Sequence, residues 1–329
     1  MTFSRYRLFP LLAIMALGLI LAACDDDSNG NGNGDDAAAD GDDPIHAIST
    51  TTWLHDAVSN VGGDLVEAES LMGPGIDPHD YIATEGDLTR MERADIIFYN
   101  GHHLEGAMSD VLGQVDQQRR TLAVAEQIDD DLLLEPDLDL LGDDFDAPYD
   151  PHIWFDIDLW KLATEVIRDE FIDIDPDNED IYQENADAYI AELDDLEDYV
   201  QERIAEIPEE QQMLITAHDA FGYFGRAFDM EVRGLQPVTT DVEAAASDIR
   251  ELADLIVERQ IPAIFLESAV PPQGIEAVQA AVIDRGFDVQ IADDALFGDA
   301  LGQEDTDEGT YVGAYRFNVD AIVNALTAD

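Results

Sequence analysis

The chain has 329 residues and a mass of 36.2 kDa, long enough for two domains with sizeable cores, and 46% of its residues are hydrophobic. Its 75 acidic and 15 basic residues give a formal net charge of −60, which argues against sequence-independent nucleic-acid binding and against docking on anionic lipids through basic patches. One explanation is an acidic disordered tail, but the acidic residues are spread over the whole chain. We therefore interpret the charge as adaptation to high salt, as in a halophile, where self-repulsion is screened.

Residues 1–23 have the features of an export signal. Arg5 and Arg7 precede an apolar run over residues 8–21, which is too short for a confident membrane span. The run ends in Leu-Ala-Ala followed by Cys24, the only cysteine, and this pattern looks like a bacterial lipobox, whose thiol is acylated and becomes the mature N-terminus. The alternative is a plain secretory signal with an incidental cysteine. Because no other cysteine is present, any metal must be held by His, Asp or Glu.

Residues 24–44 are rich in Asp, Gly, Asn and Ala without an apolar period, which predicts an acidic disordered tether. From residue 45, short apolar runs alternate with amphipathic stretches. The alternation predicts a first α/β lobe over residues 45–172, with a mostly parallel sheet flanked by helices. Its expected strands are residues 45–52, 65–72, 96–99 and 121–125, and its expected helices are residues 53–61, 85–93, 105–115 and 156–171.

Residues 129–150 break this alternation and are expected to form a surface loop. The linking segment 173–210 holds a long amphipathic stretch over 179–207 without Gly or Pro, which predicts a helix of about 43 Å. A second α/β lobe follows over residues 211–329. Its expected strands are residues 213–217, 231–235, 263–267 and 289–292, and its expected helices are residues 219–228, 243–260, 272–285 and 310–327.

Histidine is the commonest metal ligand, and the context of three histidines is suggestive. His79 and His152 each follow an Asp-Pro pair, where proline rigidifies the presentation of the next side chain, and His218 ends an expected strand. Ligands of open α/β sheets gather at the carboxyl ends of the strands, so these three imidazoles could converge. The other four histidines are interpreted as structural or surface groups; they are His46, His55, His102 and His103.

Five motifs, in order along the chain, resemble the metal-binding solute receptors of bacterial ABC importers for zinc and manganese. They are SLMGPGIDPHDY (70–81), ADIIFYNG with the following HLE (94–101 and 103–105), DPHIW (150–154), AHDAFGYF (217–224) and LFGDALG (296–302). The matches run along nearly all of the chain from residue 45. The resemblance implies His79, His152, His218 and Asp299 as metal ligands. It also implies two α/β lobes joined by one long spanning helix, with the metal in the cleft between them.

What the resemblance implies for function is a solute-binding lipoprotein anchored through Cys24 to the cell envelope, either in the periplasm or on the outer face of the cytoplasmic membrane. It would act as a monomer that captures one divalent ion and delivers it to an ABC permease. Three imidazoles and a carboxylate suit Zn²⁺, whereas Mn²⁺ prefers more oxygen, which a bidentate Asp299 would partly supply. Many zinc receptors carry a histidine-rich loop that residues 129–150 lack, so manganese stays open.

The alternatives to transport are a metalloenzyme and a surface adhesin. A zinc held by three protein ligands with an open position is a hydrolase pattern, but a fourth ligand at Asp299 would close the site, and no HExxH or GxSxG motif is present. We therefore expect no enzyme. The other alternative is a surface adhesin, as relatives of this family have been described.

Three acidic residues could accept hydrogen bonds from the N–H groups of the imidazoles around the metal. The sequence does not choose among Glu267, Asp293 and Asp294.

Overall fold

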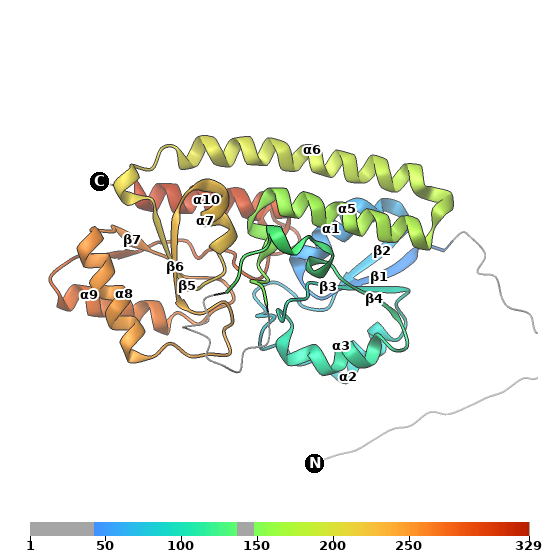
Figure 1. Ribbon diagram of the computed structural model, residues 1–329, viewed down its shortest axis with the longest axis horizontal. Coiled ribbons are helices and arrows are strands. Elements are labelled where there is room, and N and C mark those ends of the chain that lie inside the picture. Colours follow the sequence, from blue (N-terminus) through green and yellow to red (C-terminus); the bar gives the residue numbers. More distant parts are fainter. Residues whose placement is uncertain (1–42, 137–147, 329) are drawn as a thin grey trace, which may run out of the picture. The chain divides into compact units, whose positions relative to one another are not determined.

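The computed structural model describes residues 43–136 and 148–328 (Figure 1). The predicted signal peptide, Cys24 and nearly all of the predicted tether lie outside these residues, as does the 137–147 part of the predicted loop. The proposed lobe boundaries at residues 172 and 210 stay predictions. None of the helices in the described residues is long and apolar enough to cross a membrane.

The first half of the chain builds a parallel four-stranded sheet in the order β2-β1-β3-β4, which confirms the predicted architecture. The strands are β1 (Ile45–Ser49), β2 (Val66–Ser70), β3 (Ile96–Tyr99) and β4 (Arg120–Ala123). The helices between them are α1 (Thr52–Gly62), α2 (Glu85–Met91) and α3 (Ser109–Val115), and the predicted helix 105–115 begins instead with a 3-10 turn over Gly106–Met108.

Both faces of this sheet are buried, because helices cover each of them. Neighbouring strand residues point to opposite faces, so Ala47 belongs to the large core and Ile48 to a second, smaller core. The smaller core also contains Ile97, together with Met91 of α2 and Leu112 of α3. Figure 1 shows α2 and α3 on one side of the strands and α5 and α6 on the other. Such two-sided coverage is typical of parallel sheets.

The second half has two parallel strand pairs, β5–β6 and β7–β8. The strands are β5 (Met213–His218), β6 (Glu231–Gln236), β7 (Ala263–Ile264) and β8 (Gln290–Ile291), and the last two are shorter than predicted. A parallel bridge between Glu267 and Leu296 continues the β7 segment toward its carboxyl end. The helices are α7 (Gly222–Phe228), α8 (Ala246–Arg259), α9 (Gln273–Asp284) and α10 (Tyr311–Leu326).

One long helix links the halves. This is the 26-residue α6 (Glu179–Ile204), which is about 39 Å long and follows α5 (Ile157–Ile174), the last helix of the first half. The long helix begins where the sequence predicts and ends three residues earlier. Its buried side chains recur every three or four residues, which gives one apolar stripe: Tyr182, Ala186, Tyr189, Leu193, Leu196, Val200 and Ile204. Figure 1 shows α6 running past the strands of both halves, and it packs on α1 and α5 of the first and α10 of the second.

Leu193→Ala should therefore destabilise the protein by about 2–5 kcal/mol, because it leaves a cavity at a fully buried position of this stripe. Ile181→Ala on the same helix is the matched control. Ile181 is 44% exposed, so its loss should cost less than about 1 kcal/mol. The free energy of unfolding, measured by urea denaturation at high salt, checks both values, and equal losses would show that α6 does not depend on its buried stripe.

Candidate metal centre

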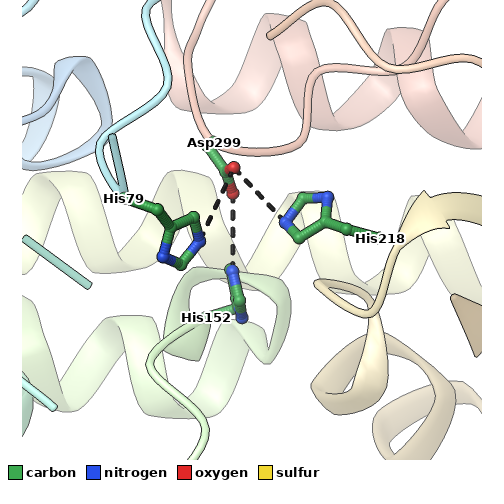
Figure 2. Close-up of side chains that lie close together, drawn as sticks. All are labelled: His79, His152, His218 and Asp299. Carbon is green, nitrogen blue, oxygen red and sulfur yellow. Dashed lines mark ion pairs between the residues drawn. The ribbon is translucent and has the colours of Figure 1, made fainter. Parts of the chain in front are cut away.

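Four side chains far apart in the sequence converge at one point between the two halves (Figure 2). They are His79, His152, His218 and Asp299, each offering one ligand atom, and these atoms all lie within 4.8 Å of one another. All four residues are at most 1% exposed. The structure thus brings together the whole set that the sequence predicts.

Each member of the cluster follows from a local feature of the fold. His218 is the last residue of β5, and Asp299 follows the bridge at Leu296, so both lie at carboxyl ends of parallel segments, where ligands gather. His79 lies in the loop between β2 and α2. His152 immediately precedes a 3-10 turn over Ile153–Phe155, which leads into α5. Two ligands therefore come from each half of the chain.

The spacing of the ligand atoms fits one metal ion. Asp299 Oδ2 lies 3.3 Å from His218 Nε2 and 3.9 Å from His79 Nε2, and Oδ1 lies 3.5 Å from His152 Nε2. A tetrahedral ion with bonds of 2.0–2.2 Å separates neighbouring ligand atoms by about 3.4 Å. Both carboxylate oxygens of Asp299 face the imidazoles, so Asp299 could bind a metal ion through one oxygen or through both.

The same atoms have no other partner. The three Nε2 atoms and both carboxylate oxygens of Asp299 are buried without a hydrogen bond. Burying polar groups without partners is costly, and such atoms in native structures call for an explanation. A coordinated cation would satisfy all five at once. The donor set therefore fits a divalent transition metal.

Two of the imidazoles are oriented by carboxylates on their far sides. His152 Nδ1 lies 2.7 Å from Asp150 Oδ1, and His218 Nδ1 lies 2.8 Å from Glu267 Oε2. Carboxylates in this position fix the ring so that Nε2 faces the metal, and they raise its basicity. The structure thus selects Glu267 from the three candidate acidic residues. Asp293 and Asp294 instead border a surface hollow beside β8 and α10.

Sequence reasoning missed the role of Asp150, although a signal was present in the repeated Asp-Pro-His. In both copies the aspartate Oδ1 accepts the backbone N–H of the histidine at 2.9 Å, from His79 to Asp77 and from His152 to Asp150. Only Asp150 also reaches the ring. In the described residues Nδ1 of His79 and of His218 makes no hydrogen bond, but His218 Nδ1 lies 2.8 Å from the Glu267 carboxylate, and no ion pair joins His79 Nδ1 to a carboxylate.

The backbone of Gly298 positions Asp299. Its carbonyl accepts the indole N–H groups of Trp53 at 3.0 Å and Trp154 at 3.1 Å, both from the first half of the chain. Two donors on one oxygen fix the peptide that precedes the ligand. Glycine is required here, because a Cβ at Gly298 would collide with the carboxylate of Glu267. Neither contact had a sequence signal, because the partners are 245 and 144 positions apart.

Burial and mutual attraction set the charges of the metal-free cluster. Burial opposes ionisation of Asp299, but the neighbouring imidazoles, His218 first, hold its pKa well below the usual range. Burial also lowers imidazole pKa values. At His152, however, Asp150 and Asp299 raise the pKa to about 9. At His218, Asp299 and Glu267 raise the pKa well above its usual value. At His79 burial prevails and lowers the pKa to about 3. The metal-free site therefore carries protons that a metal must displace.

The remaining histidines lie outside the cluster, as the sequence analysis expects. His102 and His103 form a turn in which both residues have positive φ angles, 47° and 67°, beside a hollow lined by Tyr99 and Glu126. His46 lies 3.5 Å from Glu69 near the edge of the first sheet.

Known proteins are similar to this chain in sequence and in fold. The family model for ZnuA, the periplasmic component A of a zinc-uptake complex, matches residues 48–325. The chain is 40% identical over 292 residues to the manganese-binding lipoprotein MntA of Bacillus subtilis, covering 89% of this chain and 93% of that one. It is 42% identical over 291 residues to the zinc-binding protein TroA of Treponema pallidum, covering 88% and 91%.

The solved structure of the periplasmic zinc-binding protein TroA from Treponema pallidum superposes with a TM-score of 0.81 at 41% identity, covering 87% of this chain and all of that one. Parallel sheets flanked by helices, a long linking helix and a buried three-histidine, one-aspartate cluster define a metal-binding solute receptor of ABC importers, not an enzyme. The chain belongs to the ZnuA family of zinc-uptake receptors.

Metal affinity should fall as the pH falls. His152, whose pKa is raised to about 9, is protonated in the metal-free protein below that pH, and coordination needs it neutral. Each displaced proton should lower the affinity by up to about tenfold per pH unit below 9. The loss therefore starts well above pH 6, where a free imidazole would start it. Competition against a chelator of known affinity between pH 9 and 6 checks the slope, and a flat profile would contradict the protonated metal-free cluster.

Proposed function

We propose that His79, His152, His218 and Asp299 together bind one divalent ion as the transported cargo of an ABC importer. The observation that carries this proposal is the set of five buried ligand atoms that have no hydrogen bond and are spaced for one ion. A recessed site with four protein ligands suits capture and release, because it leaves no obvious position for a reacting water. The carboxylates behind two of the rings support tight binding.

The proposed cargo is Zn²⁺ first and Mn²⁺ second. Three nitrogen donors and one carboxylate are a familiar zinc set, whereas manganese favours oxygen. The two relatives do not decide, because the manganese-binding one is 40% identical and the zinc-binding one 42% identical. Asp299 offers both oxygens, so a second bond from it would raise the coordination number for manganese.

We further propose that the chain is exported, anchored through an acylated Cys24, and works as a monomer that hands its ion to a membrane permease. Support comes from the apolar run before Cys24 and from the acidic segment between Cys24 and β1. The disordered tether predicted from that composition would let the receptor reach a neighbouring transporter while staying at the membrane. The relative in Bacillus subtilis is itself named a lipoprotein.

Elemental analysis of residues 44–329, purified at high salt, tests the binding proposal. One equivalent of zinc that excess manganese does not displace is the expected result. Preferred retention of manganese would identify a manganese receptor with the same ligands. The absence of any stoichiometric metal would overturn the ligand assignment and favour the adhesin alternative.

Two histidine variants serve as the internal control of that experiment. His218→Ala removes a ligand and should weaken binding by at least about 100-fold, since it also leaves Glu267 buried beside an empty position. His103→Ala changes a turn outside the cluster and should leave the affinity within about twofold. The reverse pattern would mean that the cluster is not the binding site.

Cys24→Ala tests the anchor separately. Without a thiol to acylate, the protein should move from the membrane fraction to the soluble extracytoplasmic fraction or the medium, while its metal affinity stays unchanged. Fractionation of cells expressing each form, followed by immunoblotting, gives the readout. An unchanged membrane fraction would show that something other than Cys24 holds the protein there.

A further inference from the structure

A groove between α2 and α3 combines apolar and basic side chains on the surface of the first half. Its walls include Leu88 and Arg93 from the α2 side and Val111, Val115 and Arg119 from the α3 side. Leu88 is 37% exposed and is one of few large apolar side chains that reach the surface, and both valines are only partly buried. The three apolar side chains form the floor of the groove and one arginine lies on each side, while Glu92, Gln114 and Gln118 complete the lining.

The side chains of Arg93 and Arg119 have no partner in the part of the chain that the structure describes. Every other basic side chain in the described residues has one: nine form ion pairs, Arg250 bonds to a carbonyl of its own helix, and Arg316 lies over the ring of Tyr199. Within residues 43–136 and 148–328, the side chains of Arg93 and Arg119 make no hydrogen bond, ion pair or ring contact, and both residues are exposed. In a chain with 75 acidic residues, two unpaired arginines on one groove are a marked exception.

The two helices that form the groove are connected through the backbone to a proposed metal ligand. The loop that carries His79 leads directly into α2 (Glu85–Met91), and the carbonyl of His79 accepts the backbone N–H of Ala107 at 3.3 Å, in the turn that begins α3. Both helices that form the groove are therefore tied to the backbone of this ligand. Figure 1 shows them on the side of the strands away from α6.

We propose that this groove is where the permease docks, through a segment that presents carboxylates beside an apolar side chain. The inference rests on the proposed transport function and names the receptor surface that serves it. Charge complementarity selects the occupant: the rest of this acidic chain repels an acidic segment, whereas Arg93 and Arg119 attract one. The apolar floor excludes water from the contact, so high salt screens it less than an exposed pair. Arginine with apolar neighbours is also the composition found at the centre of protein interfaces.

The test is uptake of radioactive zinc by cells of the native host, with the chromosomal copy replaced by the double variant Arg93→Glu/Arg119→Glu. The matched control is Arg250→Glu/Arg259→Glu on α8, which makes the same change in net charge at exposed positions outside the groove. We expect uptake to fall at least about tenfold in the groove variant and to stay within about twofold in the control. Both purified proteins should keep the zinc affinity of the unmodified chain, measured by chelator competition.

Each other result has a definite meaning. Normal uptake by the groove variant, or an equal loss in both variants, would overturn the docking inference while leaving the metal site intact. Failure of the unmodified protein to bind zinc or manganese would instead overturn the proposed function. As a second measurement, a benzophenone amino acid in place of Leu88 should crosslink on illumination to the permease subunit, identified by mass spectrometry. A crosslink to a second copy of this chain alone would overturn the inference.

Discussion

The structure depends on one buried charge. The carboxylate of Asp299 has no exposed surface, and its ion-pair partners are three imidazoles at 3.3 to 3.9 Å. An ionised carboxylate is costly to bury unless cations surround it, so the fold must bring histidines from three distant segments to this point. In the metal-free protein, protons on two of the rings supply the positive charge, and in the loaded protein the metal would supply it. Folding and the proposed cargo binding would thus be coupled at Asp299.

The three histidines of this environment are supported unequally. His152 and His218 are each oriented by a carboxylate, from Asp150 and Glu267, whereas His79 has no such support for its ring. The loop of His79 is instead fixed through its backbone, and Thr240 donates a hydrogen bond to Asp77 at 2.6 Å across the two halves. The long helix α6 packs on both halves, which favours small movements of such loops over a large hinge motion. The α2–α3 groove connects to this same loop.

Predictions from sequence were most accurate where local periodicity decides. The long helix was predicted from an amphipathic stretch without Gly or Pro, and the parallel strands from short apolar runs that alternate with amphipathic stretches. Boundaries were less accurate where turns intervene, as at the 3-10 turn before α3. The four site residues were predicted by motifs whose order matches a known family, and the structure brings them together.

The sequence by itself determined the fold class, the long helix and the candidate ligands, because these depend on local pattern and on motifs. The tertiary structure decided which acidic side chains support the rings, since the choice of Glu267 over Asp293 depends on where the β7 segment ends. It also decided the contact of Trp53 with the carbonyl of Gly298, 245 positions later in the chain, and the isolation of two arginines beside one groove. Such contacts follow from the path of the whole chain, and no local pattern encodes them.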